Sequence, residues 1–322
     1  MKVKTTVFGF ILLFNFTFSE QLNCNFELRN RDWYFPNQTL HQCIIEHQSI
    51  VTRGMTISKN SSQHVEVLRI EHESLLVKFI PGGIADSFEN IKAIRILNTS
   101  IDELFSGDFK NLNDLEYLYL GFNQIDTIHK NVFQDLHKVN YLNLDNNKLL
   151  YIGSDWFKCL TNLNELYLRG NQIEMLSSKA FYTLSNLKLL NVFDNKISLL
   201  ADETFDSLVN LEELNVGSNK LESIGKGLLK NNERLQKLSF CYNKLNSIPS
   251  EAFNEMKNLV EVDLEKNECI NEFYNQSSLE TMKVDLGKNC LPLSDHLNEC
   301  RSSEKDLIEK IKAIENSHVS KE

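Results

Sequence analysis

The sequence predicts an α/β solenoid, a horseshoe whose concave face is a parallel β-sheet. Two observations predict this fold class. Apolar residues and an asparagine recur every 24 residues from Ile91 to Asn267, with no insertion. Cysteines lie just before and just after that region, where a repeat array needs caps to cover its apolar ends.

Residues 1–19 are predicted to be a secretory signal peptide. Lys2 and Lys4 precede an apolar run from Val7 to Phe18, and small residues suit a cut after Ser19. The alternative is an uncleaved anchor, but the run is shorter than the ~20 residues that span a bilayer. We therefore expect a secreted, extracellular protein without membrane insertion.

The net negative charge of the chain disfavours some classes of binding partner. Losing the two lysines of the signal peptide changes the formal net charge from −10 to −12. Nucleic acids and anionic membranes attract basic surfaces, so we expect neither as a partner.

Residues 20–64 are predicted to form an N-terminal cap in which Cys24 pairs with Cys43. The secreted chain also carries four sequons for N-glycosylation, and we expect at least some of them to be modified. Their asparagines are Asn37, Asn60, Asn98 and Asn275.

Residues 65–267 are predicted to be the repeats, with one degenerate unit over 65–90 and then eight units of 24. In the second unit, Leu118 and Leu120 are two residues apart on one strand, so both point into the core. The asparagine at position nine is expected to bond backbone groups in a buried ladder. The phenylalanine at position nineteen is expected to fill the convex half of the core. This pattern resembles extracellular leucine-rich repeats of the 24-residue type.

Residues 268–292 are predicted to be a C-terminal cap with a disulfide between Cys269 and Cys290. A helix through Leu279, Met282 and Leu286 is expected to cover the last apolar edge.

Residues 293–322 are predicted to form a short helix with a heptad pattern that includes Cys300. Cys300 then faces its counterpart in a disulfide-linked parallel dimer. Two alternatives stay open: the helix packs on its own cap, or Cys300 competes for Cys269 or Cys290. Cys159 and Cys241 are expected to lie too far apart to bridge, with Cys159 buried and Cys241 partly exposed.

The layout resembles that of secreted insect leucine-rich repeat proteins, among them the mosquito leucine-rich-repeat immune proteins. The matching stretches are "HQCIIEHQSI" at 41–50, "NNKL" at 146–149, "GNQI" at 170–173, "DNKI" at 194–197 and "NECINEFY" at 267–274. The resemblance implies a role in innate immunity. One departure is that the family carries a long coiled coil, whereas this chain has a short tail.

The outward positions of the predicted sheet carry the candidate binding residues. Aromatic side chains at these positions on neighbouring strands are expected to form one exposed patch, and such patches usually mark interaction sites. The alternative is that they stabilise the sheet by cross-strand packing. The expected partner-binding residues are Tyr117, Tyr119, Phe122, Tyr141, Tyr167, Arg169 and Phe193.

The last units turn acidic through Glu213, Glu261, Asp263 and Glu265, which suits either a basic partner or a solvated face. A glycan on Asn98 would crowd the other end of the concave face.

No motif in the chain indicates an enzyme. HExxH, paired Cys/His metal spacing and GxSxG are missing, and "IPGGI" at 80–84 lacks the lysine of a phosphate loop. We expect no catalytic residue, no metal and no cofactor. The expected function is recognition of a protein or glycoconjugate through the concave face. The alternative is a structural component of the extracellular matrix or of cell adhesion.

Overall fold

The computed structural model describes residues 21–22, 25–32, 35–45, 50–51, 56–57, 65–71 and 76–290. The predicted signal peptide, Cys24, Asn60, Cys300 and the heptad segment 293–322 lie outside the described residues. Asn37 belongs to a described strand, but its side chain is not among those described.

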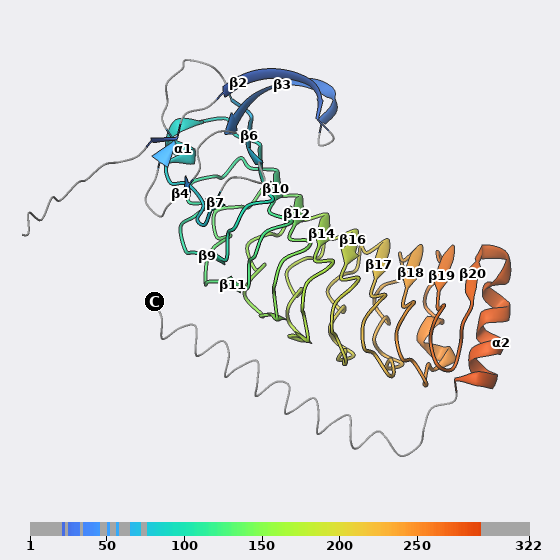
Figure 1. Ribbon diagram of the computed structural model, residues 1–322. Coiled ribbons are helices and arrows are strands. Elements are labelled where there is room, and N and C mark those ends of the chain that lie inside the picture. Colours follow the sequence, from blue (N-terminus) through green and yellow to red (C-terminus); the bar gives the residue numbers. More distant parts are fainter. Residues whose placement is uncertain are drawn as a thin grey trace, which may run out of the picture.

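A sheet of twelve strands runs along one side of the described chain, and the turns of the repeats lie on the other (Figure 1). Its parallel part includes one strand of the predicted degenerate unit and one strand of each of the eight regular units. These are β6 (Val67–Glu71), β8 (Ala93–Leu97), β10 (Tyr117–Tyr119), β12 (Tyr141–Asn143), β14 (Glu165–Tyr167), β16 (Leu189–Asn191), β17 (Glu213–Asn215), β18 (Lys237–Ser239) and β19 (Glu261–Asp263). The predicted parallel solenoid is confirmed.

The register of the sheet follows the repeat. Leu118 of β10 pairs with Ile94 of β8 and with Leu142 of β12, and each is almost fully buried. The residues on either side of each such leucine, for example Tyr117 and Tyr119, point to the opposite side because side chains alternate along a strand. We call this outward side the sheet face. It corresponds to the predicted concave face.

The position-nine asparagines form the predicted ladder. Asn171 donates from Nδ2 to the carbonyl oxygens of Leu144, at 2.9 Å, and Leu168, at 3.0 Å. Its Oδ1 accepts the backbone N–H of Leu149 at 3.1 Å. The same bonds recur at Asn147, Asn195, Asn219 and Asn243. Each asparagine thus satisfies backbone groups that would otherwise be buried without a partner.

A column of phenylalanines fills the half of the core away from the sheet. Phe133 and Phe157 stack with 6.4 Å between ring centroids, and Phe157 and Phe181 stack at 6.4 Å. The column continues to Phe109 and Phe205, and all five rings are buried. Stacked rings in successive units join the repeats into one core.

The N-terminal end of the sheet is an antiparallel hairpin of β2 (Asn25–Asp32) and β3 (Phe35–Ile45). Strand β3 pairs in parallel with β6, opposing Cys43 to Leu68 and Ile45 to Ile70. Cys43 and Ile45 are buried, so they extend the two apolar rows of the repeats. Cys43 is disulfide-bonded, and its predicted partner Cys24 lies outside the described residues.

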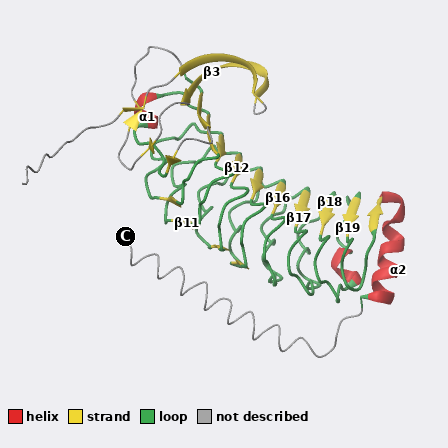
Figure 2. Cartoon of the chain, viewed as in Figure 1, coloured by secondary structure: helices red, strands yellow, loops and turns green. Residues whose placement is uncertain are grey.

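The C-terminal cap is as predicted. Strand β20 (Phe273–Asn275) pairs antiparallel with β19, and η2 (Gln276–Ser278) leads into α2 (Leu279–Asn289). Met282 and Leu286 of α2 are buried against the last repeat. Cys269 and Cys290 form a disulfide with their Cα atoms 5.1 Å apart. Figure 2 shows α2 closing this end of the solenoid.

The remaining elements are short. Two-residue strands pair in parallel as β1 (Gln21–Leu22) with β5 (Thr56–Ile57), β4 (Ile50–Val51) with β7 (Leu76–Val77), β9 (Glu103–Leu104) with β11 (Thr127–Ile128), and β13 (Tyr151–Ile152) with β15 (Met175–Leu176). The short helices are α1 (Ile84–Ser87) and η1 (Ser250–Phe253).

Candidate functional site

Four tyrosines on three neighbouring strands of the sheet face are in ring contact. The Tyr141 ring centroid lies 6.1 Å from that of Tyr117, 6.4 Å from that of Tyr119 and 5.3 Å from that of Tyr167. Equivalent positions on neighbouring strands are about 4.8 Å apart, which brings the rings into contact. Phe193 extends this group at position seven of the fifth repeat unit. We call Tyr117, Tyr119, Tyr141, Tyr167 and Phe193 the aromatic patch.

The patch is contiguous, but it is less exposed than the sequence suggested. Tyr141 is only 8% exposed because neighbouring rings cover it on both sides. The other four rings are half-buried. The expectation of an exposed patch is therefore corrected in degree: the rings stack on one another and present only part of their surface to solvent.

The tyrosine hydroxyls are neutral at physiological pH. Burial raises the pKa of Tyr117, Tyr119, Tyr141 and Tyr167 above the usual value of 10.0. The Tyr167 hydroxyl donates to Glu165 Oε2 at 2.8 Å, and this carboxylate also raises the pKa of Tyr167. The patch therefore offers apolar rings with neutral polar tips, as protein interfaces often do.

Two guanidinium groups flank the aromatic patch. The Arg95 guanidinium lies 5.1 Å from the Tyr119 ring centroid, and its Nε is 2.5 Å from Glu71 Oε1. The Arg169 guanidinium lies 5.1 Å from the Phe193 ring centroid. The structure thus brings Arg169 to the patch. Sequence reasoning missed the part played by Arg95, because it depends on Glu71 of an earlier strand.

Asp145 is a further residue of this face that the sequence analysis missed. Its Oδ1 accepts the Arg169 backbone N–H at 2.6 Å, and its Oδ2 accepts from Asn143 Nδ2 at 3.1 Å. Burial beside the tyrosines raises its pKa above the usual value, although these two hydrogen bonds oppose the rise. Asp145 therefore fixes the neighbouring turn beneath the rings.

Phe122 lies at the turn that follows its strand rather than within the stack. It is 47% exposed and has a φ of 57°, in the left-handed region. Position eight has a positive φ in every one of the eight units, including Asn98 and Tyr242. The conformation belongs to the repeat, and it turns the side chain at this position outward.

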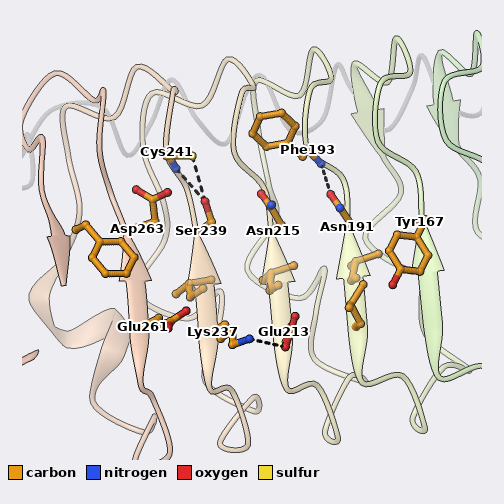
Figure 3. A pocket seen from close by; sticks show the side chains of 15 residues that line it. Tyr167, Asn191, Phe193, Glu213, Asn215, Lys237, Ser239, Cys241, Glu261 and Asp263 are labelled. Atoms are coloured by element: carbon orange, nitrogen blue, oxygen red, sulfur yellow. Dashed lines mark hydrogen bonds and ion pairs between the residues drawn. The ribbon is translucent and has the colours of Figure 1, made fainter. Parts of the chain in front are cut away.

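The structure also forms a pocket of about 400 Å³ on the C-terminal half of the sheet face. It begins at Tyr167 and Phe193 and ends at Phe273 of β20. Glu213, Lys237, Glu261 and Asp263 line its sides, as Figure 3 shows. Sequence reasoning noted the acidic residues but not the pocket.

Cys241 lines this pocket and is a free thiol. It is 6% exposed, so the expectation that it would be partly exposed was wrong. Burial raises the pKa of its thiol to about 11. Cys159 is also free and is partly rather than fully buried, which corrects its expected burial.

Two predicted glycosylation sites are described. Asn98 is exposed, and Thr99, the middle residue of its sequon, donates its backbone N–H to Oδ1 of the buried Asn123. Asn275 is exposed and caps η2 by accepting from Ser277 through Oδ1. N-glycans attach to the amide nitrogen, so the cap and a glycan use different atoms.

Two features are absent from the described part of the chain. Its histidines, cysteines and carboxylates form no group of three or more that suits a metal ion. None of its helices has the length and apolar character needed to cross a membrane.

Comparison with known proteins identifies relatives of the repeat region. The family described as "Leucine rich repeat" matches residues 89–149, 141–197, 161–221 and 209–269. Over 69 residues the chain is 44% identical to the Mus musculus leucine-rich repeat, immunoglobulin-like domain and transmembrane domain-containing protein 2. It is 38% identical to the Homo sapiens protein of that name over 66 residues. These matches span 21% and 20% of this chain, and only 13% and 12% of the relatives.

Among solved structures, the chain resembles a crystal structure of a TLR13–ssRNA13 complex, with a TM-score of 0.59 and 21% sequence identity. The match covers 63% of this chain and 29% of the other. At this identity the likeness shows the shared fold alone.

Proposed function

The chain belongs to the leucine-rich repeat family, and we propose on that premise that it is a secreted protein that recognises a protein or glycoconjugate through its sheet face. The fold is a binding scaffold of a family that typically lacks catalysis. The single observation that carries the proposal is the aromatic patch, in which four tyrosines lie on adjacent strands and Phe193 follows the end of the next strand.

The arrangement of the patch favours binding over a purely structural role. Tyr117 and Tyr119 are half-buried by Tyr141, so their rings are held in place before a partner arrives. Fixed aromatic rings lose little conformational entropy on binding, and tyrosine is enriched among residues that dominate interface energy. Arg95 and Arg169 add charged groups at the rim of the patch.

An extracellular location is supported by the caps. The Cys269–Cys290 disulfide is typical of an extracellular domain. The predicted signal peptide and the sequons point the same way. The mouse and human relatives, which match part of this chain, carry immunoglobulin-like and transmembrane domains by name.

We propose a protein or glycoconjugate rather than a nucleic acid as the partner. The chain is acidic, with a formal net charge of −10, and a phosphate backbone requires cationic groups. The related solved structure is described as a complex with ssRNA, but its likeness concerns the fold.

An innate immune role is the finer part of the proposal, and it rests on the resemblance of the caps and repeats to the insect immune proteins. A matrix or adhesion role is the alternative. Secretion into body fluid that rises on infection would favour the immune role. Deposition in tissue and binding to matrix polymers would favour the alternative.

Site-specific photo-crosslinking tests the binding face. Benzoylphenylalanine replaces Tyr119 in one variant and Tyr182 in a control, since Tyr182 is 47% exposed and follows the buried Phe181, away from the sheet. Both variants are exposed to extracellular fluid of the source organism. We expect a discrete crosslinked partner from position 119 and none from position 182. Crosslinks of equal yield at both positions, or at position 182 alone, would contradict the proposal.

A further inference from the structure

The pocket on the C-terminal half of the sheet face carries more negative than positive charge. Glu213, Glu261 and Asp263 line it together with one cation, Lys237. Lys237 Nζ lies 3.1 Å from Glu213 Oε1, so this lysine is engaged by Glu213, as Figure 3 shows. Within the described part of the chain, Glu261 and Asp263 form no ion pair. Asp263 Oδ1 accepts the Glu265 backbone N–H at 3.1 Å, and Glu261 attracts Lys237 without an ion-pair contact, so both carboxylates keep oxygen acceptors for a cation from outside.

Glu261 and Asp263 have a spacing that suits a guanidinium. They are two residues apart on β19, so their side chains emerge on the same face about 7 Å apart at the backbone. A guanidinium is a planar fork with five N–H donors and can bond two carboxylates at once, whereas an ammonium is a compact point charge. The pair therefore favours arginine over lysine.

An aromatic ring stands next to these carboxylates. Phe273 of β20 pairs directly with Asp263 of β19, lines the pocket and is 48% exposed. A guanidinium that bonds Asp263 can also stack on this ring, which adds a cation–π attraction.

The same sheet already holds one of its own arginines between a carboxylate and an aromatic ring. Arg95 pairs with the carboxylate of Glu71 while its guanidinium lies over the Tyr119 ring. At the opposite end of the sheet face, Asp263 and Phe273 provide the carboxylate and the ring, and no cation of the described chain joins them. The chain thus shows that its sheet face can hold a guanidinium between an acid and a ring.

Two asparagine side chains that can bind the backbone of a peptide ligand line the centre of the pocket. Asn191 Oδ1 accepts the Phe193 N–H, and Asn215 Oδ1 accepts the Gly217 N–H, both at 3.0 Å. Both amides line the pocket, and within the described residues no hydrogen bond uses either Nδ2. Amide donors on adjacent strands suit the carbonyl oxygens of an extended peptide. Leu189 and Phe193 supply apolar surface beside them.

We propose that this pocket binds an arginine side chain that an extended segment of a protein partner presents next to apolar residues. The guanidinium contacts Glu261, Asp263 and Phe273, and the peptide backbone lies over Asn191 and Asn215. The inference deepens the function proposed above and rests on it, since the pocket adjoins the aromatic patch at Tyr167 and Phe193.

A phage-displayed library of random heptapeptides, selected on the full secreted chain, tests the inference. We expect enriched peptides to carry an arginine next to apolar residues. A synthetic peptide of the enriched sequence should bind roughly tenfold more weakly when citrulline replaces the arginine. The same loss is expected in the Glu261→Gln, Asp263→Asn variant, which keeps the side-chain shapes. A Glu255→Gln, Glu268→Gln variant makes the same charge change at exposed residues outside the pocket and should bind normally.

The inference is overturned if the enriched peptides lack arginine, or if the pocket variant binds them as tightly as the wild type does. Lysine enriched in place of arginine also overturns the assignment of a guanidinium. A Tyr117→Ala, Tyr119→Ala variant separates this outcome from a failure of the proposed function, since neither tyrosine lines the pocket. Partner capture lost in the tyrosine variant and retained in the pocket variant leaves the proposed function standing without the arginine site.

Discussion

Tyr141 supports the aromatic patch from within. It contacts the rings of Tyr117, Tyr119 and Tyr167, and its own surface is almost covered. The neighbouring rings, rather than Tyr141, are therefore the groups that a partner can reach. Replacing Tyr141 by alanine would open a hole in the packing, so substitutions at Tyr117 and Tyr119 report more cleanly on binding.

The asparagine ladder predicts that two Asn→Ala substitutions, one inside the ladder and one outside it, lower the free energy of unfolding by different amounts. Asn171→Ala should lower the free energy of unfolding by about 3 kcal/mol, because it leaves buried backbone groups without partners. Asn186→Ala should cost less than about 1 kcal/mol, because Asn186 is exposed and bonds only the Thr161 carbonyl oxygen. Urea denaturation of both variants measures the difference. Equal losses would show that the ladder is not a main source of stability.

The two described free cysteines should differ in reactivity. In the native protein at pH 7.5, iodoacetamide should modify the partly exposed Cys159 before the buried Cys241. Only the thiolate reacts, and the Cys241 pKa is raised to about 11, so its rate should increase about tenfold per pH unit over the range below that value. Peptide mass spectrometry follows both sites, with the unfolded chain as the control. Faster labelling of Cys241 would contradict its position in the structure.

At the scale of the elements, the strands of the eight regular units could be predicted because one period fixes their register. The degenerate unit over 65–90 was also predicted and contains β6, although Leu68 and Ile94 are 26 residues apart. Strand β3 was not predicted, because the period of 24 does not reach Cys43, which lies 25 residues before Leu68. The pocket was missed for a related reason. Phe273 lies on the antiparallel β20, outside the repeat, and reaches the sheet face only because the cap folds back.

The sequence also could not predict how far the rings of the aromatic patch are exposed to solvent. Alternation along each strand assigns Tyr141 to the sheet face. How far Tyr117, Tyr119 and Tyr167 cover it depends on their rotamers, which the repeat pattern does not specify.

The C-terminal cap predicts a local effect on stability. A Cys269→Ser, Cys290→Ser variant should lose about 3 kcal/mol, since the disulfide closes a loop with a sequence separation of 21. Each repeat contacts mainly its neighbours, so the loss should begin at this end. Hydrogen exchange should therefore accelerate in α2, β20 and β19 and change little in β10 and β12. Cys159→Ser serves as the control, and uniform acceleration along the chain would contradict a capping role.

At the scale of the whole molecule, the sheet face divides into two regions with different chemistry. The units that carry β10, β12, β14 and β16 present the aromatic patch, with Arg95 over Tyr119 and Arg169 over Phe193. The units from β17 to β19 present the acidic pocket. A partner that spans both regions would need apolar surface at one end and a cationic group at the other, so the face can select for orientation as well as composition.

Whether the chain forms a disulfide-linked dimer is tested at Cys300, which lies outside the described residues. If the heptad segment pairs two copies, the secreted protein should run at twice the monomer mass on a gel without reductant and at the monomer mass with it. Cys300→Ser should run as a monomer in both conditions. A wild type that runs as a monomer without reductant would rule out the disulfide-linked dimer, and the segment would then pack on its own cap.

We propose above all that the aromatic patch of the sheet face binds the partner. The most direct test of this proposal is the affinity of the partner crosslinked at position 119, measured by surface plasmon resonance. The wild type is compared with the Tyr117→Ala, Tyr119→Ala variant and with Tyr182→Ala. We predict a loss of roughly tenfold or more for the tyrosine pair and less than about twofold for Tyr182→Ala, with all three proteins folded by circular dichroism. Unchanged affinity in the tyrosine pair would contradict the account.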